Sequence, residues 1–258
     1  MEVITILLAS LFGILSPVSF AADTLAEEAV GDRLSEAEQV EVRIDTAPNY
    51  QILQGQVNRV RFAGRGLYPV PELRVEALDI ETDAIDVDFA QARQGSLRLD
   101  EPLQAGIRLV LRQEDVNQAL QSPAIANLLR DIGLGILGED TIGGVSQGDI
   151  VDPRIEFLEG DRLRLQATLR EQGTDEELSI DLSFGLAVQN GHQLQILEPR
   201  LVTNEVEFPP EILEPLLAGV SQQLTLRNFE LFGITARLLK LEIQPDTLEV
   251  ATFVRIDP

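Results

Sequence analysis

The sequence predicts a strand-rich α+β fold built from antiparallel sheets. Several segments alternate apolar and polar residues with a period of two, most clearly Leu178 to Val188, "LSIDLSFGLAV". This period is typical of a strand with one buried face. Turn signals such as Asn190-Gly191 separate the segments, and strands joined by short turns pair antiparallel. Helical patterns are few and short, unlike those of a doubly wound parallel sheet.

The N-terminal residues 1–21 predict delivery to a membrane. Val3 to Phe20 is an uncharged run of 18 residues, and Ser19-Phe20-Ala21 fits a small-x-small cleavage site. Met1-Glu2 lacks the positive charge of an ordinary signal peptide, while 18 residues can just span a bilayer. A cleaved signal and a retained anchor therefore both remain open. Either one predicts a membrane-associated or extracytoplasmic protein.

The first half of the chain predicts one helix followed by strands. The helix falls within 23–34, "DTLAEEAVGDRL", whose early acids suit the helix dipole. A one-residue phase change at Thr82 to Ala84 predicts a bulge, and Gly64-Arg65-Gly66 predicts a turn or bulge. The alternating segments are Val40 to Ile44, Val60 to Phe62, Leu73 to Ile80, Ile85 to Phe89 and Ala105 to Leu111.

Two helices and a glycine-rich connector are expected next. "QEDVNQAL" begins with acidic residues, and "SPAIANLLRDIGL" offers Ser122 as N-cap and Pro123 at the first helical position. Residues 133–148 hold six glycines and predict a connector. We expect a single domain, 22–258, of two halves, 22–134 and 150–258, joined by this connector.

The second half predicts further strands, one helix and a closing hairpin. Residues 155 to 203 should form consecutive antiparallel strands, with Leu182 and Phe184 buried and Asp181 and Ser183 more exposed. "PPEILEPLLAGVSQQL" has a helical stripe, in which Pro215 implies a late start or a kink. The last two strands should turn at Pro245-Asp246.

Composition argues against catalysis and against metal or cofactor chemistry. The chain has no Cys, and its single His, His192, lies beside a turn signal. Thiol chemistry and imidazole-rich zinc sites are thereby excluded, and a Ser-His-Asp triad at His192 would require residues remote in the sequence to meet beside a turn. Lys240 is the only lysine, which limits Schiff-base chemistry to one position. We therefore expect no enzyme, no catalytic residues, no cofactor and no metal.

The charge of the chain argues against nucleic acid as a partner. Its formal net charge is −23 and its pI is near 4.3, whereas phosphate binding needs Lys and Arg. Asp79, Glu81 and Asp83 suggest a cation site at first. They alternate with Leu78 and Ile80 along a strand, however, which predicts a solvated outer face because a strand spreads its side chains apart.

The rows of aliphatic side chains leave two functions open. Aromatic residues make up 5% of the chain and Trp is absent, so the interior is Leu, Ile and Val. A curved sheet with few helices to fill it leaves a tube suited to acyl chains. A core packed to ordinary density explains the same rows.

The order of elements resembles that of the LmeA-like phospholipid-binding family, over about Asp23 to Ile256. The carrying stretches are "DTLAEEAVGDRL", "APNYQILQGQVNRVRFAGRGL", "LRLDEPLQAGIRLVLRQEDVNQALQSP" and "LKLEIQPDTLEVATFVRI". The leader and acidic helix are most similar to cyanobacterial members. The resemblance implies a curved antiparallel sheet wrapped around a few amphipathic helices, similar to the tubular lipid-binding (BPI-like) proteins. It also implies an apolar cavity for phospholipid acyl chains.

We therefore expect the protein to bind or shuttle phospholipid in an elongated aliphatic cavity at the cell envelope or an internal membrane, on the periplasmic or thylakoid side. Its expected partners are phospholipid, or another acyl-chain lipid, and membrane. The alternative is a non-catalytic structural or partner-binding module with a fully packed core. The predicted cavity-lining residues are Ile107, Leu109, Leu111, Leu163, Leu165, Ile180, Leu182, Phe184, Leu216, Leu217 and Val220.

Overall fold

The computed structural model describes residues 36–45, 56–86, 99–122, 148–171 and 177–258, which form mostly antiparallel strands. The chain divides into two compact units. The first unit comprises the described parts of Met1–Leu111 together with Leu226–Lys240 and Val250–Pro258. The second unit comprises the described parts of Arg112–Thr225 together with Leu241–Glu249. The prediction of a strand-rich antiparallel fold with few helices is confirmed.

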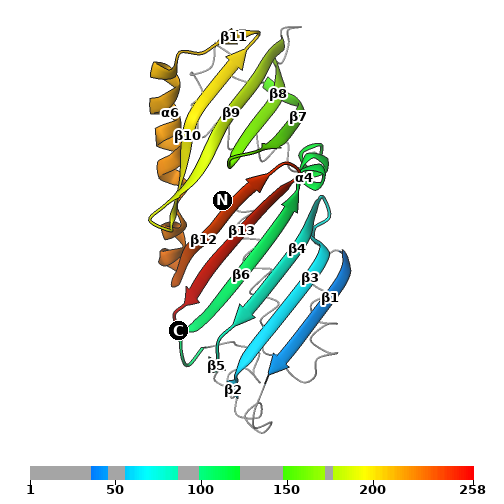
Figure 1. Cartoon of the computed structure of the whole chain (residues 1–258), viewed down its shortest axis with the longest axis vertical. Helices are drawn as coiled ribbons and strands as arrows, with labels where there is room; N and C mark the ends of the chain where they lie inside the picture. The colour runs from blue at the N-terminus through cyan, green and yellow to red at the C-terminus, as the bar shows by residue number, and fades with distance from the viewer. Residues whose placement is uncertain (1–35, 46–55, 87–98, 123–147, 172–176) are drawn as a thin grey trace. The chain divides into compact units, whose positions relative to one another are not determined.

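The first unit is built on a six-stranded sheet with the order β1-β3-β4-β6-β13-β12 (Figure 1). A separate two-stranded sheet pairs β2 with β5. The strands are β1 (Glu36–Asp45), β2 (Gln56–Val57), β3 (Arg59–Val70), β4 (Leu73–Thr82), β5 (Ile85–Asp86), β6 (Leu103–Arg112), β12 (Ile234–Gln244) and β13 (Thr247–Ile256). The last two strands give residues to both units.

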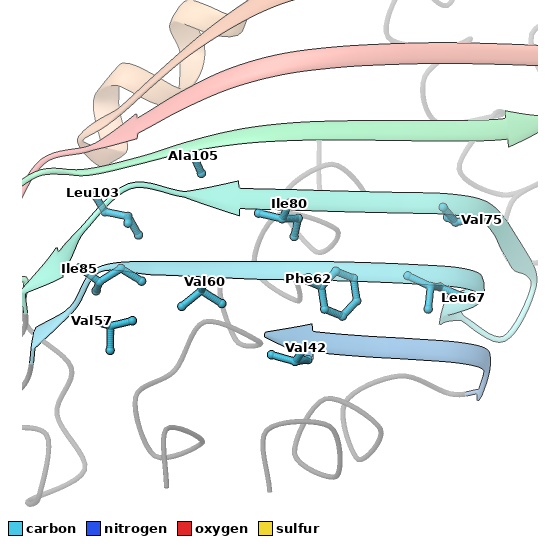
Figure 2. Packing of buried hydrophobic residues seen from close by; sticks show 10 residues of the cluster. All are labelled: Val42, Val57, Val60, Phe62, Leu67, Val75, Ile80, Ile85, Leu103 and Ala105. Carbon is cyan, nitrogen blue, oxygen red and sulfur yellow. The ribbon is translucent and has the colours of Figure 1, made fainter. Parts of the chain in front are cut away.

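One face of the six-stranded sheet is apolar because its register aligns the alternating residues of neighbouring strands. Val42 pairs with Phe62, Phe62 with Ile80, and Ile80 with Ile107. Figure 2 shows the ten buried side chains that gather there. They are Val42, Val57, Val60, Phe62, Leu67, Val75, Ile80, Ile85, Leu103 and Ala105. The core of the first unit is therefore built from cross-strand aliphatic rows around a single Phe.

The opposite face of this sheet carries ion pairs. Asp79 accepts from Arg65 at 2.6 Å and from Arg108 at 3.1 Å, while Glu81 pairs with Arg59 and Arg61. Asp79 and Glu81 thus lie on the outward face of β4, as predicted, and arginines from the neighbouring strands pair with them. Asp83, which was predicted to share this face, lies beyond the end of β4 and accepts the Gln104 N–H at 2.9 Å.

Two local predictions for this unit need correction. The phase change at Thr82 to Ala84 is not a bulge, because β4 ends there and the chain resumes as β5 in the two-stranded sheet. The Thr82 hydroxyl accepts a hydrogen bond from the Val60 N–H at 3.0 Å. At this point a side chain thus takes the place of the backbone hydrogen bonds between β3 and β4. β3 also continues through Gly64 and Gly66, so the turn predicted there is wrong, whereas an irregularity of the bulge kind occurs just beyond them in the pairing with β4. Gly66 has φ of 56°, and the register shifts just after Leu67.

The second unit is built on a five-stranded sheet with the order β11-β10-β9-β8-β7. Leu163 lies opposite Phe184 and Leu165 lies opposite Leu182, so the apolar face is continuous across β8 and β9. The predicted run of consecutive antiparallel strands over 155–203 is confirmed. The strands are β7 (Gly148–Leu158), β8 (Arg162–Glu171), β9 (Glu177–Gln189), β10 (Gln193–Thr203) and β11 (Val206–Glu207).

The burial predicted along β9 is confirmed only in part. Phe184 is buried, and it joins Phe157, Leu163 and Ile243 in the core of the second unit. Leu182 is half-buried, and so are Asp181 and Ser183. The expected contrast is missing because Arg164 lies against Asp181 on the polar face and shields it from solvent.

Within the described ranges, three short helices accompany the sheets: α4 (Gln113–Leu120), α6 (Pro210–Gln223) and η3 (Leu226–Phe232). α4 begins where predicted. α6 begins at Pro210 and includes Pro215, which excludes a late start. The closing hairpin of β12 and β13 turns at Pro245 and Asp246 as expected. The predicted helix in 23–34 falls outside the described residues, as do the helix that follows Ser122 and nearly all of the connector 133–148.

The side chains of α4 close the free edge of β7. Phe157 N–H donates to Gln113 Oε1 at 2.6 Å, and Gln121 Nε2 donates to Pro153 O at 2.8 Å. Between them, Asn117 accepts from Ile155 N–H at 2.7 Å and donates to Ile155 O at 2.8 Å. Four residues of a helix span about 6 Å along its axis, and two residues of a strand span about 7 Å. Side chains four residues apart on α4 therefore meet backbone groups two residues apart on β7. We call these three side chains the edge ladder.

Replacing Asn117 should destabilise the protein because it removes the two central bonds of the edge ladder. We expect Asn117→Ala to lower the free energy of unfolding by about 1–3 kcal/mol. Gln118 is exposed on the same helix and makes no side-chain contribution to the edge ladder, so Gln118→Ala is the matched control. Urea titration of both variants measures the difference. Equal midpoints would show that the edge ladder contributes nothing.

Candidate functional site

The residues predicted to line a cavity are divided between the two units, on strands of both sheets and on helix α6. Ile107, Leu109 and Leu111 alternate along β6 in the first unit. They pack against its core cluster but are only half-buried. Their side chains therefore keep surface that a ligand can contact.

Additional aliphatic residues share this face, although they were not among the predicted lining residues. Leu78 lies opposite Leu109 on the neighbouring strand, and Val40 lies opposite Gly64. Leu78 and Val40 are also half-buried. Gly64 completes the row without a side chain, since a Cβ there would lie 2.5 Å from Leu67 Cδ1. Alternation made these residues visible in the sequence but gave no means to rank them above other apolar positions.

In the second unit, the predicted residues divide by burial. Leu163, Phe184 and Leu217 are buried and belong to packed parts of the protein. Ile180, Leu182, Leu165 and Val220 are half-buried. Leu216 lies within α6, but its side chain is outside what the structure describes. Burial thus separates residues that fill the interior from those that retain free surface.

α6 is held along β10 by hydrogen bonds at its C-terminal end. Ile196 N–H donates to the Ser221 hydroxyl at 3.2 Å, and Leu194 N–H donates to Leu224 O at 2.9 Å. Leu213 and Leu217 are the buried apolar side chains of this helix. The helix therefore covers the second unit at β10, at the opposite end of the strand order from β7.

A hollow of about 320 Å³ lies on the polar side of the second unit's sheet. Amide, hydroxyl and carboxylate groups predominate among its lining side chains, which do not suit an acyl chain. The lining residues are Asp152, Gln166, Ala167, Thr168, Ser179, Ile180, Asp181, Val202 and Glu205. The hollow thus brings polar groups together on this side of the sheet, and Ile180 is the one predicted cavity residue among those that line it.

An arginine fixes the charge of Asp181 in this hollow. Arg164 donates to both carboxylate oxygens, with Nη2 2.5 Å from Oδ2 and Nε 2.9 Å from Oδ1. Gln166 Nε2 donates to Oδ2 at 3.1 Å. The hydrogen bond from Arg164 is the main cause that lowers the pKa of Asp181 below its ordinary value of 3.8, against a smaller opposing effect of burial. The carboxylate is therefore ionised at neutral pH.

The Asp181 pair should stabilise the fold in a pH-dependent way. The pKa of Asp181 is lower in the folded protein than in the unfolded chain. The ion pair therefore contributes its full stability at a pH above the ordinary pKa of Asp, and this stability is lost as the pH falls through the pKa of Asp181 in the folded protein. We expect Asp181→Asn to cost at most about 1 kcal/mol at neutral pH, since both partners are part-exposed. Urea unfolding across the acidic range should show this cost disappear. Glu177→Gln, at the exposed pair with Arg170, is the control and should change less. If Asp181→Asn destabilised the protein as much in acid as at neutral pH, the ion pair with Arg164 would not be the source of the stability.

The described part of the chain places no group of three or more His, Cys, Asp or Glu side chains where they would hold a metal ion. His192 lies in the turn between β9 and β10, with Nδ1 2.9 Å from Asn190 O. Within the same described ranges, no helix is long and apolar enough to cross a membrane.

Comparison with known proteins identifies one family. The family model described as LmeA-like phospholipid-binding matches residues 16–253, nearly the whole chain. No curated protein and no solved structure matches significantly.

Proposed function

Because the chain belongs to the LmeA-like phospholipid-binding family, we propose that it holds a phospholipid by its acyl chains against the half-buried apolar residues of its sheets. The family match over residues 16–253 is the observation that carries this proposal. Phospholipid binding is the family's described property. The acyl-chain surface, and any shuttling between membranes, belong to the proposal.

Burial selects the contact residues. Side chains that are fully buried, such as Phe62 or Phe184, already satisfy their contacts within the protein. Half-buried aliphatic side chains leave surface whose removal from water stabilises a complex by about 25 cal/mol per Å². The proposed contacts are Ile107, Leu109 and Leu111 in the first unit, and Leu165, Ile180, Leu182 and Val220 in the second.

The opposite faces of the sheets are poor alternatives for acyl chains. Arg65, Arg108 and Asp79 form an ionic group on the first sheet, and Arg164 pairs with Asp181 on the second. Acyl chains that covered these charged groups would remove their hydrating water and offer no hydrogen bonds in return, which is unfavourable. Only the apolar faces offer the chemistry that the lipid tails require.

A polar side chain placed on a proposed acyl contact should reduce lipid content. We expect Leu109→Gln and Leu182→Gln to carry about tenfold less phospholipid, because an amide loses hydrogen bonds when hydrocarbon covers it. Arg108→Gln and Ser183→Gln, on the opposite faces of the same strands, should load as the wild type does. The measurement is solvent extraction and mass spectrometry of purified full-length protein, after incubation with vesicles of mixed zwitterionic and anionic phospholipid.

Circular dichroism and urea unfolding of the same samples separate loss of lipid from loss of fold. A wild-type protein that carries no phospholipid and takes none up would overturn the proposal. It would leave the alternative of a non-catalytic structural or partner-binding module with a packed interior.

We also propose that residues 1–21 deliver the protein to a membrane or an extracytoplasmic compartment. The support is the uncharged run Val3 to Phe20 and the cleavage-site pattern that ends it. Deleting residues 2–21 should move the protein into the soluble cytoplasmic fraction, as measured by cell fractionation and immunoblotting. A full-length protein found wholly in the cytosol would show that the leader has another role.

A further inference from the structure

Three large apolar side chains are strongly exposed within one short segment of the first unit, Leu226–Lys240. Leu231 and Phe232 end η3 with 87% and 72% of their surface exposed, and Leu239 on β12 is 69% exposed. Six large apolar residues are exposed in the described ranges, and half of them fall in these nine positions, 231–239. Exposed apolar side chains scattered singly need no explanation, but a concentration of this kind marks an interaction surface.

The local backbone holds Leu231 and Phe232 at a turn. Gly233 follows them with φ of 72°, a conformation that favours glycine, and leads into β12. Gly233 N–H donates to Glu230 O at 3.1 Å, and Gly233 O accepts from Asp257 N–H at 2.9 Å. The apolar pair is therefore presented from a hydrogen-bonded turn that also fixes the chain end.

The charge of the segment has the opposite sign to that of the whole chain. Leu226–Lys240 contains Arg227, Arg237 and Lys240 against Glu230, a net charge of +2, while the chain as a whole has −23. The carboxylate of Asp257, next to Gly233, pairs with Arg255 at 2.9 Å. A basic stretch with exposed Leu and Phe is the combination that binds the interface of an anionic bilayer.

We propose that Leu226–Lys240 docks the protein on the surface of a phospholipid bilayer, with Leu231 and Phe232 inserted at the boundary between headgroups and acyl chains. The inference deepens the proposed function, on which it rests, because a protein that takes up phospholipid must meet the membrane that holds it. Arg227, Arg237 and Lys240 supply the attraction to anionic headgroups. The proposed binding partner of Leu226–Lys240 is thus a lipid surface. The alternative that the experiment must distinguish is self-association of the protein through the same segment.

The absence of Trp from the chain permits a site-specific test. Phe232→Trp places a single indole at the proposed insertion point. Val206→Trp is the matched control, since Val206 is 65% exposed but belongs to the second unit, outside the segment. Full-length protein is mixed with vesicles of phosphatidylcholine and phosphatidylglycerol whose acyl chains carry bromine, which quenches indole fluorescence at close range. Because the readout is local, anchoring through residues 1–21 does not imitate it.

The F232W variant should show a blue shift and at least twofold quenching, stronger with anionic lipid than with phosphatidylcholine alone. The V206W variant should show neither effect. Replacing both apolar residues, L231S with F232S, should reduce vesicle binding of the protein lacking residues 2–21 by about tenfold, provided that circular dichroism shows this form to be folded. Equal quenching of the two Trp variants, or none in either, would overturn the proposal. So would a blue shift of F232W that follows protein concentration without vesicles, together with a doubled mass in light scattering.

Lipid extraction distinguishes the failure of this inference from that of the proposed function. If F232W is not quenched while the wild type still carries phospholipid, only the docking surface is wrong. If F232W is quenched and the wild type carries no phospholipid, docking stands and lipid uptake is wrong.

Discussion

The second unit is organised around one constraint, which is that the backbone N–H and C=O groups at the edges of its β-sheet need hydrogen-bond partners. A five-stranded open sheet has two edge strands whose N–H and C=O groups must find partners. At β7 the partners are Gln113, Asn117 and Gln121, which reproduce on a helix the spacing of a neighbouring strand. On the other side, β11 pairs with β10 only at Val202 and Thr203, and the end of α6 supplies partners farther along β10 through Ser221 and Leu224. Two of the described helices, α4 and α6, thus lie where strands of this unit lack a full neighbour.

Ion pairs decide which face of each sheet meets water. Arg65, Asp79 and Arg108 come from three adjacent strands, and the Asp79 carboxylate pairs with both arginines across the first sheet. Arg164 and Asp181 do the same across β8 and β9. These pairs add little stability individually because they are part-exposed. They do oppose a slip by one residue, which would bury the charges and expose the aliphatic rows.

Much of this fold was predictable because strand periodicity is a local property. The segments containing Leu163 and Leu178 alternate so regularly that antiparallel pairing and the buried Phe184 could be predicted. The edge ladder was not predictable, since Gln113 and Asn117 on a short helix resemble an ordinary solvated face. The end of β4 was also misread, because a hydroxyl of Thr82 that substitutes for the ladder leaves no pattern in the sequence. The acyl-contact residues remain a prediction, since alternation alone ranks Leu109 and Ile80 equally.

The closing hairpin of β12 and β13 has a consequence for how the chain acquires its structure. Leu226–Lys240 and Val250–Pro258 complete the first unit, while Leu241–Glu249 belongs to the second. β6 finds its second neighbour, β13, only at the end of the chain. Neither unit is therefore complete until the C-terminal segment has left the ribosome, and both depend on contacts between residues far apart in sequence. Such topologies fold slowly. A growing chain keeps an unfilled sheet edge at β6 until Thr247–Ile256 has been made, and this open edge must be kept from pairing with other chains until then.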